Sequence, residues 1–259
     1  MAATTVNVKT PATKKPVNYG ELIQKGMAFG VLIILAILFG ITTGGTFLRP
    51  ENLLTIALQV TPYAILGFGL TFVIITGGID LSVGSILGFG GIVCAKLLTN
   101  GCGILPAILI AMVLGAAVGL INGLCVTRLG VVAFIVTLGS QFAFRGLTQL
   151  VGHGKPVSVQ SLPDKQLVAR FKFLGGGTIF GIIPIPMLIM FAVAIILGIL
   201  LAKTGYGRRL YAVGSNEEAA RLSGINVNQT KLIAYLICGL TAALAGVLMA
   251  GRLAYAQSN

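Results

Sequence analysis

The chain has 259 residues, of which 56% are hydrophobic and only 9% are charged, and its mean hydropathy is +0.99. A water-soluble domain is about 25% charged, so this composition excludes a globular protein with a solvated surface. The formal net charge of +12 would suit nucleic-acid binding, but nucleic-acid binders gather their cations on one polar face, whereas these cations stand mainly between apolar runs. We therefore expect an all-α, polytopic membrane protein that lies in the lipid bilayer and binds no nucleic acid.

The first 26 residues are polar and carry four lysines. The apolar run that follows starts too late and is too long for a cleaved secretory signal. Because cytoplasmic segments of membrane proteins are enriched in Lys and Arg, we expect residues 1–26 to be a basic cytoplasmic tail. Residues 27–259 are then one transmembrane domain.

Seven apolar segments follow the tail, and each is compatible with a helix of about 20 residues that spans the bilayer. They are residues 27–47, 53–76, 83–98, 104–127, 131–150, 184–203 and 231–254. With the tail inside, each span takes the chain to the other side of the membrane. The loop 151–183 is then outside the cell and the loop 204–230 is inside. Small residues four positions apart predict close helix contacts, and they occur in GITTG (40–44), GSILG (84–88), GAAVG (115–119) and GLING (119–123).

The stretch GGIDLSVGS, residues 77–85, places an acid in a chain that has only six acids. The span that follows it, residues 83–98, is only about 24 Å long at 1.5 Å per residue, whereas the hydrocarbon core is about 30 Å thick. This pattern predicts a helix that breaks inside the protein near residues 77–85. Transporters use such breaks at substrate sites, because the freed backbone groups there face a cavity.

Two interpretations of this stretch stay open. Asp80 or Ser82 is suited to cap the following helix and so to stabilise the break at Gly77 and Gly78. Alternatively, Asp80 contacts the substrate or a gate, since an acid inside the membrane is a candidate for function. Arg145 is the other charge predicted within a span, and it either pairs with Asp80 or lines the pathway.

The segment YAVGSNEEAARLSGI, residues 211–225, is strongly polar and lies in the predicted inner loop. Ser215 and Glu218 have the spacing of a capping box. Glu217 and Glu218 fall where the helix dipole favours anions, and Arg221 falls where it favours cations. Gly224 is placed to end the helix in a left-handed conformation. We expect a helix of about two turns, which needs a partner because a helix this short is marginal alone; docking only on its own chain is the alternative.

These two stretches, with the sequence up to AYAQ, resemble the membrane permease of ribose-type ABC sugar importers. The resemblance implies an inner-membrane protein that imports a monosaccharide such as ribose. Its implied partners are a second permease subunit, forming a homodimer, cytoplasmic ATP-binding subunits and a periplasmic sugar-binding protein. Family members continue with further spans, so the resemblance also implies a permease truncated at its C-terminus.

The resemblance further implies that residues 204–230 contain the coupling loop that docks on the ATPase. The residues that match this loop are Glu217, Glu218, Ala219, Ala220, Arg221 and Gly224. ATP would be bound by the partner subunit, so we expect no cofactor in this chain. The resemblance does not select the sugar.

The sequence offers no catalytic or metal site. It has one histidine, His153, and four cysteines without CxxC spacing. The nearest approach to a phosphate-binding loop, GHGKP at 152–156, lacks the required spacing and the Ser or Thr. We therefore expect no enzyme. An ion-coupled secondary transporter, a channel and a membrane fragment without transport activity remain as alternatives to the importer permease.

Overall fold

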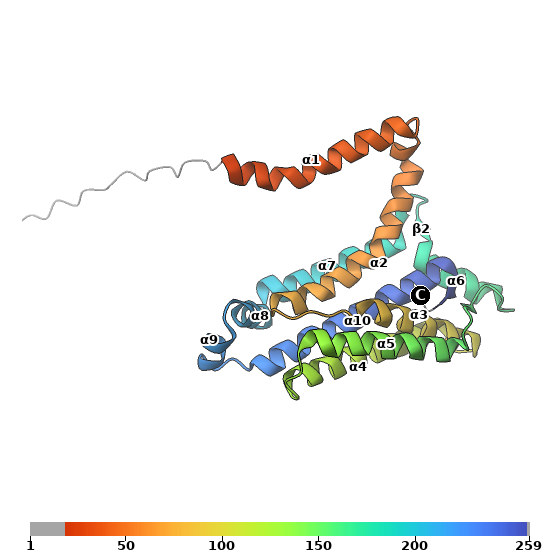
Figure 1. Ribbon diagram of the computed structural model, residues 1–259. Coiled ribbons are helices and arrows are strands. Elements are labelled where there is room, and N and C mark those ends of the chain that lie inside the picture. Colours follow the sequence, from red (N-terminus) through yellow and green to blue (C-terminus); the bar gives the residue numbers. More distant parts are fainter. Residues whose placement is uncertain (1–18, 258–259) are drawn as a thin grey trace, which may run out of the picture. The chain divides into compact units, whose positions relative to one another are not determined.

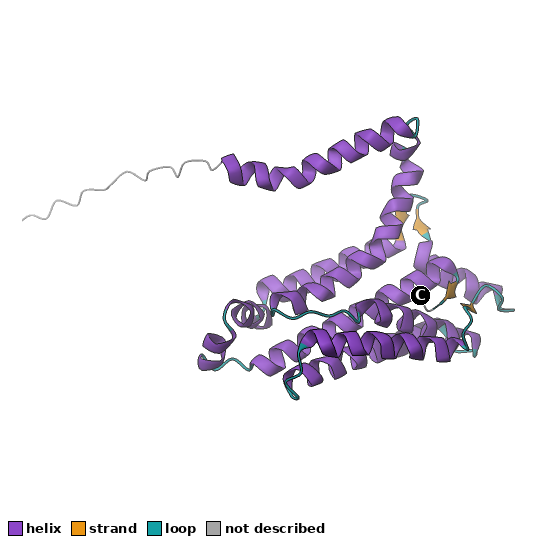
Figure 2. Ribbon diagram, in the orientation of Figure 1, coloured by secondary structure: helices purple, strands orange, loops and turns teal. Residues whose placement is uncertain are grey.

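The computed structural model describes residues 19–257, which are almost entirely helical (Figures 1 and 2). The helices are α1 (Tyr19–Thr42), α2 (Pro50–Ile75), α3 (Val83–Thr99), α4 (Ile104–Thr127), α5 (Ala133–Gly152), α6 (Lys165–Gly176), α7 (Ile185–Lys203), α8 (Gly205–Ser215), α9 (Glu217–Leu222) and α10 (Val227–Leu253), with the 3-10 helix η1 (Thr46–Leu48). The strands have two residues each: β1 (Val157–Ser158), β2 (Thr178–Ile179), β3 (Ile183–Pro184) and β4 (Tyr255–Ala256). The predicted all-α fold is confirmed.

The seven predicted spans coincide with α1, α2, α3, α4, α5, α7 and α10. Within the described residues, α2, α4, α7 and α10 are long and apolar enough by themselves to cross a membrane. α3 and the apolar part of α1 are shorter, and α5 is less apolar because it carries Gln141, Arg145 and Gln149. Of the predicted tail, residues 1–18 lie outside the described residues, and α1 begins earlier than expected, at Tyr19.

The described residues divide into two compact units, 19–53 and 54–257. In the first unit, α1 ends in a turn where Gly44 and Gly45 adopt φ values of 57° and 81°. The rings of Phe39 and Phe47 pack across this turn with their centroids 5.4 Å apart.

In the second unit, α10 is the central helix, and it packs against α3, α4 and α6. The apolar part of α10 is 67% buried inside the chain, whereas that of α7 is only 6% buried. The apolar side chains of α7 are therefore left for lipid or for another subunit.

Glycines allow α4 and α10 to approach closely, as the motifs at 115–123 predicted. A Cβ atom at Gly119 would collide with the carbonyl oxygen of Tyr235, and one at Gly115 would lie 2.7 Å from that of Gly239. The prediction fails for GSILG, because a Cβ atom at Gly84 would have no atom within 4 Å. The contact between α3 and α10 uses Gly90 and neighbouring small residues instead, since these face α10.

The two predicted loops contain helices and lie at opposite ends of the second unit (Figure 1). The loop 151–183 contains α6, and β1 pairs with β4 beside it in antiparallel register, Val157 opposite Ala256. The loop 204–230 contains α8 and α9. α8 was not predicted. The break between α2 and α3 and the short helix α9 both lie in this one compact unit.

Candidate functional site

The predicted break is present, because α2 ends at Ile75 and α3 begins at Val83. The end of α2 is closed by hydrogen bonds from the backbone N–H groups of Thr76 and Gly78 to the carbonyl oxygen of Val73, both 3.1 Å long. Gly77 has φ 75°, a left-handed conformation that glycine adopts without a steric penalty. The chain then runs without helical structure to Ser82.

Asp80 and Ser82 form a buried polar cluster at the start of α3. The Asp80 Oδ1 atom accepts hydrogen bonds from the backbone N–H of Ser82 at 2.9 Å and from its hydroxyl at 2.5 Å. Asn122 on α4 donates to Ser82 Oγ at 2.9 Å. Asp80 thus holds Ser82 and does not itself cap α3; Ser82 occupies the N-cap position but its side chain makes no capping bond.

The second oxygen of Asp80 differs from the first. Within the described residues, Asp80 Oδ2 has no hydrogen-bond partner, although Asp80 is only 3% exposed. The thiol of Cys238 on α10 is close enough to interact with this carboxylate. A buried oxygen without a strong donor is costly, which makes Asp80 a candidate for function as well as a support of the break.

The other face of the break is exposed. Exposed and buried side chains alternate along the break: Ile79 is 50% exposed and Leu81 is 36% exposed, whereas Asp80 and Ser82 are buried. Within the described residues, the backbone N–H groups of Ile79, Asp80 and Leu81 donate no hydrogen bond. Lipid cannot satisfy such groups, so non-helical backbone at membrane depth must face protein or a water-filled cavity. This face therefore suits a pathway or the surface of another subunit.

Arg145 lies apart from this cluster. No ion pair joins it to Asp80 within the described residues, so the structure does not contain the pairing that the sequence left open. Arg145 instead lines a cavity of about 110 Å³ between α3, α5 and α10. The polar side chains that share this cavity are Ser85, Thr148, Tyr255 and Gln257.

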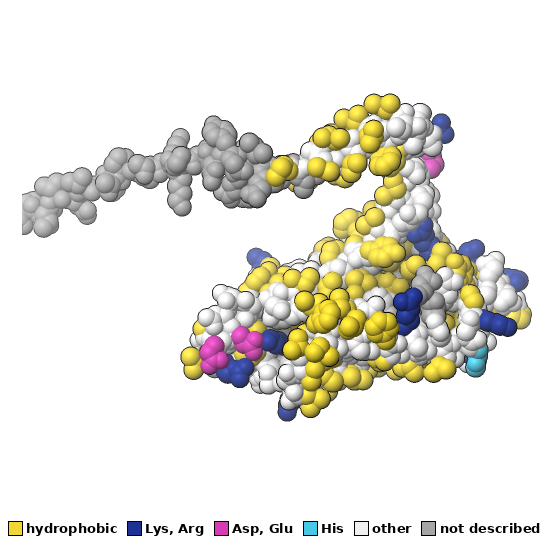
Figure 3. Space-filling model, viewed as in Figure 1, with side chains coloured by type: hydrophobic (Ala, Val, Ile, Leu, Met, Phe, Trp, Pro, Cys, Tyr) yellow, Lys and Arg dark blue, Asp and Glu magenta, His cyan; other side chains and the backbone are white. Residues whose placement is uncertain are grey.

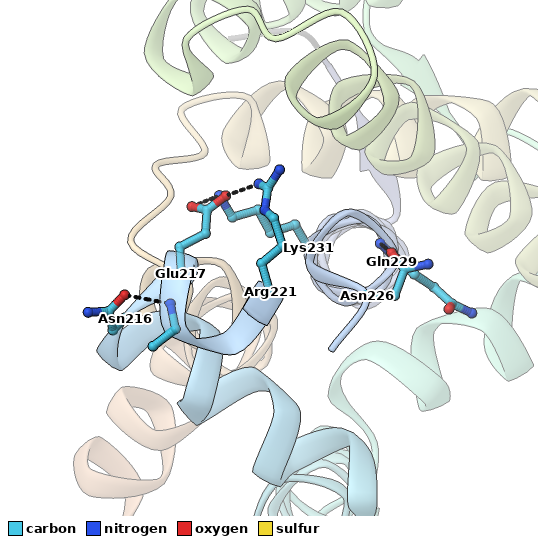
Figure 4. Close-up of polar contacts among 7 residues, drawn as sticks. Asn216, Glu217, Arg221, Asn226, Gln229 and Lys231 are labelled. Atoms are coloured by element: carbon cyan, nitrogen blue, oxygen red, sulfur yellow. Dashed lines mark hydrogen bonds and ion pairs between the residues drawn. The ribbon is translucent and has the colours of Figure 1, made fainter. Parts of the chain in front are cut away.

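The short helix α9 begins one residue later than the predicted capping box. Ser215 is the last residue of α8, and the N-cap of α9 is Asn216, whose Oδ1 accepts from the backbone N–H of Ala219 at 2.9 Å (Figure 4). The prediction of Ser215 as the cap was wrong because α8 extends to this residue. Gly224 has φ 81°, as predicted for the residue that ends the helix.

Glu217 connects α9 to α10. Its Oε2 atom accepts from Lys231 Nζ at 2.6 Å, and its Oε1 atom accepts from Arg221 at 3.3 Å (Figure 4). The hydrogen bond from Lys231 lowers the pKa of the Glu217 carboxyl below its ordinary value, although partial burial opposes the shift. Glu217 therefore lies in the first turn of α9, as predicted, and it also joins α9 to Lys231 on α10.

α9 has one buried and one exposed face. Ala220 is buried in a small apolar cluster with Val213 and Val227, so part of α9 docks on its own chain. Glu218 and Ala219 are exposed. The exposed face is the part of α9 that is free to contact another protein.

Comparisons with known proteins identify the family of the chain. Residues 52–259 match the family described as "Branched-chain amino acid transport system / permease component". The chain belongs to this permease family. Membership of this family implies association with ATP-binding and substrate-binding components of a transport system. It also supports a multi-pass protein of the inner membrane.

Three relatives of the permease show which members it resembles. The ribose import permease protein RbsC of Bacillus subtilis (strain 168) is 40% identical over 245 residues, covering 94% of this chain and 74% of that protein. RbsC of Escherichia coli (strain K12) is 39% identical over 236 residues, 91% of this chain and 72% of that protein. The D-allose transport system permease protein AlsC of E. coli (strain K12) is 36% identical over 255 residues, covering 98% of this chain and 76% of that protein. The resemblance to ribose-type permeases is confirmed. No solved structure matches the chain.

Three residues of this permease stand out that the sequence did not mark. Leu222 on α9 is 81% exposed, on a helix outside the apolar spans; a leucine within the polar run EEAARL was the available signal. Tyr235 and Lys231 on α10 contact the break and α9 respectively. Nothing in the sequence marked these contacts, because they join segments that are far apart in the chain.

Proposed function

We propose that the chain is the membrane-spanning permease subunit of an ABC importer that moves a monosaccharide into the cytoplasm. A separate subunit binds and hydrolyses the ATP. Ribose is the first substrate to test, because RbsC relatives are named for ribose, and allose is the second because of AlsC. The observation that supports the proposal most directly is α9, a capped helix with an exposed face, in a chain that belongs to a permease family.

The contacts of α9 support a coupling role. Its buried face fixes it on α8 and α10, and Lys231 ties Glu217 to α10. A partner that moves α9 therefore moves the inner end of α10. We propose that the exposed residues Glu218, Ala219 and Leu222 contact the ATP-binding subunit, and that Gly224 sets the turn back to α10.

The opposite end of the second unit is basic, which suits a partner with an acidic surface. Its cations are Lys155, Lys165, Arg170, Lys172 and Arg252. Asp164 is the one acid in 151–183, and its carboxylate is occupied at the N-terminus of α6, where it accepts from Gln166 and Leu167. Figure 3 shows Lys and Arg side chains at this end and acids at the α9 end. We propose that the sugar-binding protein docks here, on the outer side, and that the N-terminus is cytoplasmic.

We propose that two copies of the chain form the pathway. The break exposes backbone N–H groups that lipid cannot satisfy, and a second copy or the water of a pathway would cover them. Gly77, Gly78, Asp80 and Ser82 then stand beside the pathway, and Arg145 contributes donors for sugar hydroxyls from its own cavity.

The experiment measures ATPase co-purification and sugar uptake in cells that express the chain with its ATP-binding and sugar-binding components. Ala219→Trp places a large ring on the exposed face of α9, so co-purification and uptake should both fall. Gln160→Trp adds the same ring at the opposite end of the unit and is the matched control for membrane insertion and for ATPase co-purification, both of which it should leave unchanged. Disabling the ATPase while the proton gradient is intact should abolish uptake. Uptake that survives this change would instead indicate an ion-coupled carrier or a channel.

A further inference from the structure

Two side chains one turn apart on α10 join α9 to the break. Lys231 and Tyr235 are four residues apart, so they lie on the same face of the helix. Lys231 Nζ donates to Glu217 Oε2 on α9 at 2.6 Å. The Tyr235 hydroxyl donates to the carbonyl oxygen of Ile79, in the break, at 3.3 Å. A short stretch of α10 therefore contacts both elements.

The same two side chains line one cavity. Its volume is about 270 Å³, and Lys231 and Tyr235 form part of its wall. The remaining wall comes from the break, residues 76–79, from Val126 at the end of α4, and from residues 131–134 before α5. The break thus has unoccupied space beside it at the end of the unit where α8 and α9 lie.

The break is also held by few bonds. The backbone N–H groups of residues 76–78 still bond to carbonyls of α2, but those of residues 79–81 make no hydrogen bond within the described residues. The Tyr235 hydroxyl is the one donor to the Ile79 carbonyl there. A segment with few buried contacts and few hydrogen bonds opens at low free-energy cost. A bond of 3.3 Å is at the long end of the range for a hydroxyl donor, so it can form in one state and break in another.

We propose that residues 79–81 are the cytoplasmic gate of the pathway, and that Lys231 and Tyr235 connect this gate to α9. The proposal rests on the proposed function, because it assigns the control of the gate to the subunit that contacts α9. When α9 moves with the ATP-binding subunit, the ion pair carries Lys231 and its helix face along. The Tyr235 hydroxyl then leaves or reaches the Ile79 carbonyl, and Ile79 moves into or out of the cavity. Tyr235 and Lys231 are positioning residues, since neither has to touch the sugar.

The test uses the chain reconstituted in lipid vesicles with its ATP-binding and sugar-binding components, and it measures ATP hydrolysed per sugar transported. Tyr235→Phe removes only the hydroxyl. We expect ATPase association and hydrolysis to persist while the ratio of ATP to sugar rises by about fivefold or more, the lower range of an allosteric coupling. Lys231→Met should raise the same ratio, and Lys231→Arg should restore it, because Arg keeps the ion pair.

Tyr206→Phe is the matched control. Tyr206 is also buried, and its hydroxyl also donates to a backbone carbonyl, that of Thr230 on α10 at 3.1 Å. This bond does not reach the break, so its loss should leave the ratio of ATP to sugar unchanged. A merely structural role of buried tyrosine hydroxyls would give the same result for Tyr206→Phe and Tyr235→Phe.

A second measurement follows the gate directly. Ile79 is half exposed, so a cysteine at Ile79→Cys should react with a maleimide, at a rate that changes when a non-hydrolysable ATP analogue is added. Tyr235→Phe in the same background should remove this nucleotide dependence. If the maleimide reaction of Ile79→Cys has the same rate with and without nucleotide while Tyr235 is present, the gate proposal is wrong. If Tyr235→Phe leaves the ratio of ATP to sugar unchanged, Tyr235 does not connect α9 to the gate. Failure of the unsubstituted chain to bind the ATPase would contradict the proposed function instead.

Discussion

The side-chain amide of Asn122 on α4 donates to the hydroxyl of Ser82 across 2.9 Å, and that hydroxyl in turn donates to Asp80. The bond joins residues 40 positions apart in the sequence and fixes the start of α3 against α4. The break between α2 and α3 is therefore a built feature with buried polar partners. Its stability depends on an acceptor at position 80, which gives the first prediction.

Asp80→Asn should be mild and Asp80→Leu severe. Asparagine keeps an oxygen that can accept from the backbone and hydroxyl of Ser82, and it removes a buried charge. Leucine leaves those donors without an acceptor, at a cost of about 1–3 kcal/mol for each buried unsatisfied group. We expect the membrane level and the uptake of Asp80→Leu to fall together, measured by quantitative blot and by labelled sugar.

The two variants also separate the two roles of Asp80. Loss of uptake in Asp80→Asn, at a normal membrane level, would show that the charge itself acts in the pathway. Full activity of both variants would contradict any role of this residue in the break.

Gly119→Val should prevent the permease from folding. A side chain there would collide with the carbonyl oxygen of Tyr235 on the neighbouring helix, and backbone contacts between α4 and α10 cannot shift cheaply. Gly198→Val is the control, because a Cβ atom at Gly198 on α7 would have no atom within 4 Å. We expect Gly198→Val to reach the membrane at a normal level and Gly119→Val to be degraded. Equal levels would show that the close packing of α4 on α10 is dispensable.

Much of the fold could be predicted because lipid imposes simple rules on sequence. Apolar length indicated the spans, and the short third span with Gly77 indicated the break. The glycines at 115–123 indicated close packing because small residues serve few other purposes in a helix. What failed was local: Ser215 looked like a cap, but the sequence could not show that α8 extends to it.

The missing parts of the site are contacts between distant segments. Asn122 meets Ser82, and Tyr235 meets Ile79, only because α4, α10 and the break share one interior. Single residues of these types are common in membrane helices, so no spacing marks them. Arg145 shows the same limit: its place in a helix was predicted, but its predicted burial was wrong, because the packing of α5 leaves this residue exposed.

The ion pair of Glu217 with Lys231 predicts a dependence on pH. The pKa of Glu217 is lowered in the folded chain, so the pair stabilises the fold above the ordinary pKa of a glutamate. That stability is lost as the pH falls through the lowered folded pKa. Since Glu217 is 43% exposed in its side chain, we expect at most about 1 kcal/mol.

Thermal unfolding of the purified permease tests this dependence. The midpoint of Lys231→Met should lie below that of the unsubstituted chain at about pH 7, and the difference should shrink as the pH falls through the lowered pKa of Glu217. Lys172→Met, a change of the same kind at an exposed position on α6, is the control. A difference between Lys231→Met and the unsubstituted chain that persists at low pH would show that Lys231 acts by packing rather than by charge.

The topology predicts which cysteines an impermeant reagent can label in intact cells. Lys165→Cys, at the start of α6, should react, because we place residues 151–183 outside. Glu218→Cys, which is also exposed, should react only after the cells are opened. The reverse pattern would invert the chain in the membrane and place α9 out of reach of a cytoplasmic ATPase.

Leu222→Asp should separate the permease from its ATP-binding subunit without unfolding it. Leu222 is 81% exposed, so its replacement removes no contact inside the chain, whereas a charged side chain would be buried without a partner in a protein interface. An exposed leucine on a short polar helix is the kind of apolar anchor that interfaces bury. We expect ATPase co-purification to fall by about tenfold or more, the loss that follows from about 1.4 kcal/mol, and uptake to fall with it.

Leu222→Met is the control for Leu222→Asp, since it keeps an apolar side chain of similar volume and should keep both co-purification and uptake. The membrane level of each variant shows whether the chain still folds. If Leu222→Asp binds the ATPase as well as the unsubstituted chain, the exposed face of α9 is not the contact surface. Ala220, which is buried on the other face, could not take that role without α9 leaving α8 and α10, so the contact would then have to lie on α8 or in the turn at Gly224.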